Sequence, residues 1–316
     1  MKKLLSVILT VSLSTAALTG CAISTNQENS DSNDEKIRVV AVNFPQYDFV
    51  RQLAGDLVDL KLLVQPGTEV HDYDPSPQDL IAVQECDLLI YVGGESDSWV
   101  EDILGSTELS QDKVFSMMDC VDKYFEETQE GMTEHEGEEE EEYDEHIWTS
   151  PKNAIKIVDA ICEKLSAIDS ENASTYEKNR LDYVRSLSTL DNHIEEIVAN
   201  AEEKTLIFGD RFPFLYFVRA YGLDYYAAFP GCSEDSEPTA ATLSFLIDKV
   251  KEEKISTVFY IEQSDQKTAD IICEETGAKK LLFHSCHNVT KSEFDEGVTY
   301  LQLMEKNVEN LREALK

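Results

Sequence analysis

Short apolar runs alternate with longer segments of helical periodicity along most of this chain. The first half has four such runs, at residues 36–43, 58–64, 86–92 and 113–117. Their composition is typical of buried strands. The segments between them space their apolar residues three or four positions apart, which predicts helices at 47–57, 78–84 and 99–104. Strands that alternate with helices predict βαβ units and a parallel sheet.

The same alternation resumes in the second half of the chain. Strands are predicted at 205–208, 224–228, 257–261 and 280–284. Helices are predicted at 213–221, 240–253, 266–276 and 300–315. We therefore expect an α/β protein with two parallel-sheet lobes, an N-terminal lobe over 36–168 and a C-terminal lobe over 204–316.

A helical pattern without interruption separates the two sets of strands. A helix is predicted at 151–167, and residues 172–201 continue as one amphipathic segment without Gly or Pro. At 1.5 Å per residue this segment would span roughly 45 Å, the length of two lobes. We expect residues 169–203 to form a rigid linking helix, with His193 on its surface.

The N-terminus has the features of a sorting signal. Lys2 and Lys3 precede the apolar run 4–17, and the following Leu-Thr-Gly-Cys ends at Cys21. This sequence resembles the lipobox of bacterial lipoproteins, in which the cysteine is lipidated after cleavage. Residues 1–21 are then a signal peptide, and the polar stretch 22–35 is a disordered tether. We expect the protein on the extracellular face of the cell membrane, held by a lipid on Cys21.

The charge of the chain narrows the choice of partners. Its 316 residues carry a formal net charge of −36. Such a charge argues against binding of nucleic acid or of an anionic membrane surface, and favours attraction of cations. Much of it lies in residues 126–145, with twelve acidic residues and no basic one. We expect a solvated loop there, which either adds solubility or collects cations weakly through its carboxylates and His135.

The cysteines do not identify a metal site by their spacing. Apart from Cys21 there are six, and none forms a Cys-x-x-Cys pair, which argues against a thiolate zinc cluster. An extracytoplasmic location permits disulfides, while Cys162 and Cys273 lie on apolar helix faces where core thiols are common. The sequence leaves both possibilities open.

One histidine lies in a stiff loop after a predicted strand. Residues 66–77 open with a Pro-Gly turn, close with Pro-Ser-Pro and carry His71 next to Asp72. Loops at strand ends are where α/β proteins present ligand-binding groups. Taken alone, the loop is also compatible with a plain surface turn.

Two segments together resemble the ligand motifs of the metal-binding solute receptors of ABC importers. That group includes zinc-binding ZnuA-like proteins and manganese-binding lipoproteins. Residues 66–77 resemble its first motif. Residues 144–151, Asp-Glu-His-Ile-Trp-Thr-Ser-Pro, resemble its second, usually Asp-Pro-His-x-Trp-x-x-Pro. The resemblance covers the chain from about Lys36 onward. It implies a metal site in the cleft between two lobes, with His71 and His146 as ligands.

The C-terminal lobe departs from the family pattern. The third ligand, His or Glu, corresponds to Arg211, which cannot bind a cation. The resemblance leaves Asp210 or a water molecule to replace it. The fourth ligand falls near His284, with Cys286 and His287 as neighbouring alternatives. The expected set is therefore His71, His146, His284 and Asp210.

This donor set favours zinc over manganese. Imidazole nitrogens suit Zn²⁺, whereas Mn²⁺ prefers carboxylates and water. The resemblance then implies a monomeric, lipid-anchored receptor that delivers Zn²⁺ to the permease and ATPase of an ABC importer. The alternatives are a manganese or iron receptor of the same fold, and a surface adhesion lipoprotein with a degenerate site. We expect no enzyme, because the sequence has no Ser-His-Asp spacing, no His-Glu-x-x-His and no Gly-rich phosphate loop.

Overall fold

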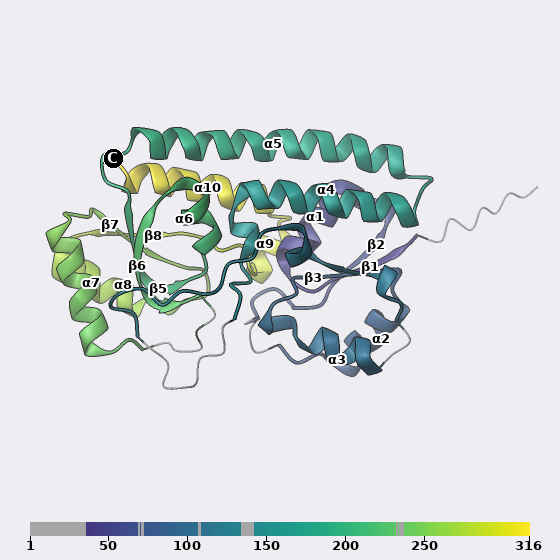
Figure 1. Cartoon of the computed structure of the whole chain (residues 1–316), viewed down its shortest axis with the longest axis horizontal. Coiled ribbons are helices and arrows are strands. Elements are labelled where there is room, and N and C mark those ends of the chain that lie inside the picture. The colour runs from purple at the N-terminus through teal and green to yellow at the C-terminus, as the bar shows by residue number, and fades with distance from the viewer. Residues whose placement is uncertain are drawn as a thin grey trace, which may run out of the picture. The chain divides into compact units, whose positions relative to one another are not determined.

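Two four-stranded parallel sheets form the framework of the protein (Figure 1). The computed structural model describes residues 36–68, 70, 73–106, 109–133, 142–231, 233 and 237–316. In the first sheet the strands lie in the order β2-β1-β3-β4. Their bounds are β1 (Arg38–Ala41), β2 (Asp59–Leu62), β3 (Leu88–Tyr91) and β4 (Val114–Ser116).

The second sheet repeats this topology with later segments of the chain. Its order is β6-β5-β7-β8, so in both sheets the second strand in sequence lies outside the first, with the third and fourth on the other side. The strands are β5 (Thr205–Phe212), β6 (Asp224–Pro230), β7 (Thr257–Tyr260) and β8 (Lys279–Leu282). All neighbours within each sheet are parallel. The predicted α/β class with two parallel sheets is confirmed.

Helices connect the strands, and several begin with local capping interactions. Ser76 caps α2: its hydroxyl oxygen accepts the N–H of Asp79 while the Asp79 carboxylate accepts the N–H of Ser76. Thr290 and Thr299 begin α9 and α10 in the same way. The connecting helices are α1 (Phe44–Ala54), α2 (Pro77–Glu85), α3 (Trp99–Ser106), α6 (Leu215–Tyr221), α7 (Ala240–Glu252) and α8 (Lys267–Thr276). Two more helices, α9 (Lys291–Asp295) and α10 (Tyr300–Ala314), follow the last strand.

Along the chain, two long helices separate the strands of the first sheet from those of the second. They are α4 (Pro151–Ile168) and α5 (Ala173–Asn200). Figure 1 shows that α5 runs alongside α10 at one end and alongside α4 at the other. Helix α5 packs against α1 and α4 from the first half and against α6 and α10 from the second half. Its buried face consists of Tyr176, Tyr183, Leu187, Leu190, Ile194 and Val198.

Buried contacts join the first and last helices of the described chain. The carboxylate of Asp48 on α1 is fully buried, pairs with Arg51 and accepts the N–H of Tyr300, the first residue of α10. The Tyr300 hydroxyl donates to the carbonyl of Trp148, 2.7 Å away. One apolar cluster contains residues of both halves, and Lys36–Lys316 form one compact unit. These contacts therefore hold the two halves of the described chain together.

Strand β5 is longer than the sequence indicated. We predicted its end at Phe208, but it continues to Phe212 and includes Asp210 and Arg211. Its pairing with β6 shifts register between Phe208 and Arg211. At Gly209 a Cβ would lie 2.6 Å from the Cα of Ala269, so the close approach of α8 requires glycine there.

The acidic segment is only partly the solvated loop that we expected. Residues 134–141, including His135, lie outside the described residues. The two ends of the segment pair with each other, because the N–H of Glu126 donates to the carbonyl of Glu142 at 2.8 Å. Asp144 and Glu145 are each only 1% exposed, so the prediction is wrong for these two residues.

The cysteines of the described chain are unpaired thiols. Cys86, Cys162 and Cys286 are buried, whereas Cys120 and Cys273 are partly exposed. A core role, one of the two possibilities that the sequence left open, therefore applies to the three buried cysteines. Among the described residues, no helix has the length and hydropathy that a membrane span requires.

Candidate metal centre

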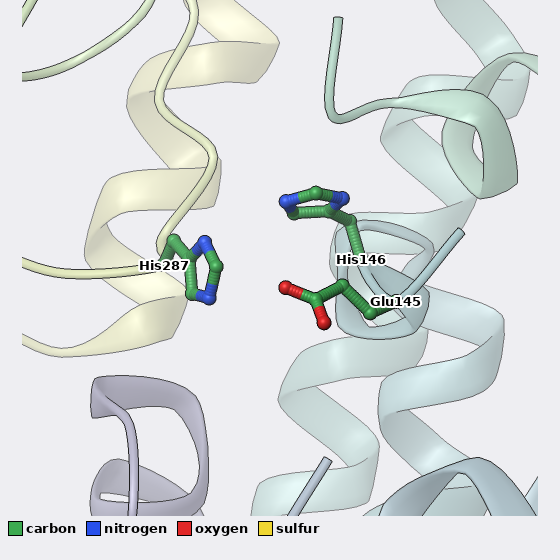
Figure 2. Close-up of side chains that lie close together, drawn as sticks. All are labelled: Glu145, His146 and His287. Carbon is green, nitrogen blue, oxygen red and sulfur yellow. The ribbon is translucent and has the colours of Figure 1, made fainter. Parts of the chain in front are cut away.

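Three buried side chains bring metal-binding atoms together. One ligating atom each from Glu145, His146 and His287 lies within 4.8 Å of the others. Figure 2 shows Glu145 and His146 on one side and the ring of His287 facing them from another segment. The three residues are 1%, 1% and 6% exposed. Two imidazoles and a carboxylate at this spacing form a candidate site for a divalent transition metal.

The backbone around His146 fixes the direction of its ring. His146 precedes the short 3-10 turn Ile147–Thr149, which leads into α4. The Asp144 carboxylate accepts the N–H of His146 at 2.8 Å and lies 3.2 Å from its Nδ1. A carboxylate beside Nδ1 holds the proton on that nitrogen, which directs the Nε2 lone pair to a metal.

The protonation of His146 responds to several acidic groups. Burial lowers the pKa of His146, but the hydrogen bond and charge of Asp144 raise it, with further contributions from Glu145 and Glu126. The net result is a pKa above the ordinary value of 6.5. The site therefore favours positive charge at this position, from a proton or from a metal ion.

The loop after β3 holds the Glu145 carboxylate. The N–H of Ser96 donates to Oε2 of Glu145 at 3.1 Å. At Gly94 a Cβ would lie 2.3 Å from that same oxygen, so the loop approaches the carboxylate too closely for any other residue. Asp97 is buried nearby; burial and the charge of Glu145 raise the pKa of Asp97 to about 7. The carboxylate of Glu145 thus lies in a concentration of negative charge that attracts cations.

A strained turn after β8 positions His287. Cys286 has φ 62, which is uncommon for a residue with a side chain. The N–H of His287 donates to the Ser285 hydroxyl at 3.1 Å, and that hydroxyl in turn bonds to the carboxylate of Glu262. Trp148 donates from Nε1 to the carbonyl of Ser285 at 2.8 Å, and its ring lies 4.9 Å from that of His287. The turn is therefore tied to the segment that carries His146.

A small cavity of about 30 Å³ adjoins the two histidines. Its volume is sufficient for one or two water molecules. Arg211 lines it, so a cationic side chain lies at the position where the family pattern has a ligand. The lining residues are Thr68, Val70, His146, Arg211, Pro213, Gly231, Ile261, Glu262, Gln263, Ser285, His287 and Asn288.

Two residues of the predicted site lie outside the described residues, namely His71 and Cys21. The chain just before His71 does reach the site, because Thr68 and Val70 line its cavity. The side-chain amide of Asn288 donates to the carbonyls of Gln65 at 2.9 Å and Thr68 at 2.8 Å. These contacts hold the loop after β2 against the residue that follows His287.

The structure does not bring His284 or Asp210 into the group of ligating atoms found among the described residues. Nδ1 of His284 accepts the N–H of Cys286 at 2.9 Å, which stabilises the turn before His287. The Asp210 carboxylate accepts the N–H groups of Arg211 at 2.9 Å and Ile261 at 3.3 Å. Both side chains therefore stabilise nearby backbone, at Cys286 for His284 and at Arg211 and Ile261 for Asp210. The sequence analysis named His287 as an alternative to His284, and it is the ring of His287 that lies in this group.

The sequence interpretation did not include Glu145. It stands where the family motif usually has proline, and it also belongs to the acidic run 126–145 that we expect from the sequence to be solvated. The signal in the sequence was its position directly before His146, since carboxylate oxygens as well as imidazole nitrogens bind Zn²⁺. The direction of its side chain depends on Gly94 and Ser96, which lie about fifty residues earlier.

Comparisons with known proteins agree with an α/β protein that has two parallel sheets. The family model of ZnuA, zinc-uptake complex component A, periplasmic, matches residues 39–314. The chain therefore belongs to the ZnuA family, which is a family of zinc-uptake components. The chain is 33% identical over 312 residues to the zinc-binding lipoprotein AdcA of Streptococcus pneumoniae. That match covers 97% of this chain but only 60% of AdcA.

One further relative and one solved domain of AdcA match over nearly their whole length. The high-affinity zinc uptake system protein ZnuA of Bacillus subtilis is 30% identical over 308 residues, which cover 93% of this chain and 92% of that protein. The solved Zn(II)-bound ZnuA-like domain of Streptococcus pneumoniae AdcA is similar with a TM-score of 0.72 and 30% identity. This structural match covers 89% of this chain and 99% of that domain.

Proposed function

We propose that this protein captures Zn²⁺ outside the cell membrane and delivers it to the permease and ATPase of an ABC importer. The observation that carries the proposal is the buried group of Glu145, His146 and His287. Family membership and the names of the relatives, zinc-binding and zinc uptake, support zinc as the cargo. The protein acts as a monomer in this proposal.

Four ligands complete the proposed coordination. Zn²⁺ takes four N, O or S donors at about 2.0–2.3 Å. Glu145, His146 and His287 supply three, and His71 supplies the fourth from the loop that Asn288 holds at the cavity. In this set Glu145 replaces the third family ligand, which Arg211 has displaced. Its negative charge also offsets the charge of the guanidinium.

The lipid on Cys21 is the proposed attachment to the membrane. A lipobox-like sequence precedes Cys21, and residues 22–35 are polar enough to serve as a tether. The periplasmic description of the family and the lipoprotein name of AdcA agree with an extracytoplasmic location. Growth with labelled palmitate tests this: the wild type should carry the label and Cys21→Ala should not.

Elemental analysis of protein purified without chelators tests the proposed function. The wild type should retain about one zinc per chain, and His146→Ala and His71→Ala should retain much less. Competition between Zn²⁺ and Mn²⁺ in calorimetry separates zinc from the manganese alternative. Wild-type protein that binds no zinc, or that binds Mn²⁺ more tightly, would contradict the proposal.

A further inference from the structure

A polar contact reaches the ring of His287 from the other half of the chain. The side-chain nitrogen Nδ2 of Asn43 lies 3.2 Å from Nε2 of His287. Asn43 follows β1, directly before α1, and is 1% exposed. The side chain of a first-lobe residue therefore contacts a proposed ligand of the second lobe inside the protein.

The backbone of Asn43 is held independently of this contact. Its N–H donates to the side-chain oxygen of Gln46 at 3.0 Å, and its carbonyl accepts the N–H of Tyr47 at 3.2 Å. Asn43 is also the N-cap residue of α1, so its side-chain amide lies between the start of that helix and the ring of His287. Its oxygen Oδ1 is buried and has no hydrogen-bond partner among the described residues.

The orientation of this amide determines which nitrogen of His287 offers a lone pair. An asparagine amide has a donor on one side and an acceptor on the other, and a half-turn exchanges them. With Nδ2 toward the ring, Nε2 accepts and the ring proton is on Nδ1. With Oδ1 toward the ring, Nε2–H donates and the lone pair is on Nδ1. The second orientation also gives Oδ1 the partner that it lacks.

We propose that Asn43 is a positioning residue that selects Nδ1 of His287 as the zinc-binding nitrogen. In the zinc-bound protein Oδ1 of Asn43 accepts the Nε2–H of His287, and this bond fixes both the tautomer and the ring orientation. Histidine ligands in metal sites commonly donate their second N–H to an oxygen in this way. The inference rests on the proposed function, since it assigns a role toward the proposed cargo.

Zinc affinity of three variants, measured by chelator competition at pH 7.5, tests the inference. Asn43→Leu removes the acceptor and should weaken binding by about 10- to 100-fold. Asn43→Asp retains an acceptor and should bind within about threefold of the wild type or more tightly. The control is Asn179→Leu, whose native amide donates to the carbonyl of Leu53 at 2.8 Å, and it should leave affinity unchanged.

Nitrogen NMR of the zinc-bound wild type gives a readout that does not depend on variant folding. Spectra of ¹⁵N-histidine protein, assigned with His287→Gln, should show zinc on Nδ1 and a proton on Nε2 of His287. Zinc on Nε2 would overturn the inference, as would an equal loss of affinity in Asn43→Leu and Asn43→Asp. Tight binding by both wild type and Asn43→Leu would overturn the inference alone. A wild type that binds no zinc would overturn the proposed function as well.

Discussion

The two sheets have the same strand order but present different chemistry at the candidate site. The first half of the chain supplies Glu145 and His146, with Asp144 and Asp97 buried close by. The second half supplies His287 and, across the same cavity, the guanidinium of Arg211. Shared topology therefore determines where ligand-bearing segments lie, while individual residues determine the charge that each half contributes.

The unequal charge of the two halves affects how the site binds a dication. Negative charge concentrates on the first-half segment, which attracts a metal ion and raises the pKa of His146. Arg211 repels an ion on the other side, and its Nη1 reaches the carbonyl of Ser233 at 3.4 Å. We therefore expect the first half to contribute more of the binding free energy, with His287 as the main contribution of the second half.

The largest effect is expected from loss of either central imidazole. His146→Ala and His287→Ala should each weaken zinc binding by about 100-fold or more, which corresponds to roughly 3 kcal/mol. Chelator competition measures the change, and His193→Ala is the control because His193 lies exposed on α5. A His287 variant with wild-type affinity would show that the second half contributes no ligand.

A fall in pH should weaken zinc binding because metal and protons compete for His146. Metal binding requires neutral imidazole, and the raised pKa of His146 means that protonation begins at a higher pH than for an ordinary histidine. Affinity should therefore fall as pH drops through that raised pKa, by about tenfold or more from pH 7.5 to 5.5. Calorimetry at the two pH values measures this; equal affinities would argue against imidazole ligation.

Replacement of Arg211 should reduce the difference in charge that the two halves present to the ion. Arg211→His removes a positive charge and supplies a donor at the family ligand position, so zinc should bind about tenfold more tightly. Arg211→Gln, which removes only the charge, should give a smaller gain of a few fold. If both variants bind zinc more weakly than the wild type, Arg211 supports the site instead of opposing the ion.

His284→Ala should have the smallest effect on zinc affinity, within about threefold. Its Nδ1 accepts the buried N–H of Cys286, so its removal should cost about 1–3 kcal/mol in the free energy of unfolding. Urea unfolding of the metal-free protein measures this cost. A 100-fold loss of affinity at unchanged stability would restore His284 as a ligand.

The fold was largely predictable from the sequence. Apolar runs predicted the eight strands found among the described residues, and each of these strands begins within two residues of its predicted start. The sequence did not predict the extension of β5 through Arg211, because glycine and charged residues at 209–211 are not typical of a buried strand. Contacts with β6 and α8 outweigh that local preference.

The candidate site was only partly predictable. The motif indicated His146, which the structure places in the ligand group. Choosing between His284 and His287 required the turn at Cys286, whose positive φ is not evident from its residue type. The burial of Glu145 depends on contacts with Gly94 and Ser96, and sequence periodicity does not report such distant contacts.

A crystal structure of the zinc-loaded protein with anomalous data at the zinc edge would locate the ion and its ligands. We expect one strong peak bonded to Glu145, His146 and His287 at about 2.0–2.2 Å, with His71 as the fourth ligand. A peak on His284 or Asp210, with Glu145 still bonded only to the loop after β3, would contradict it.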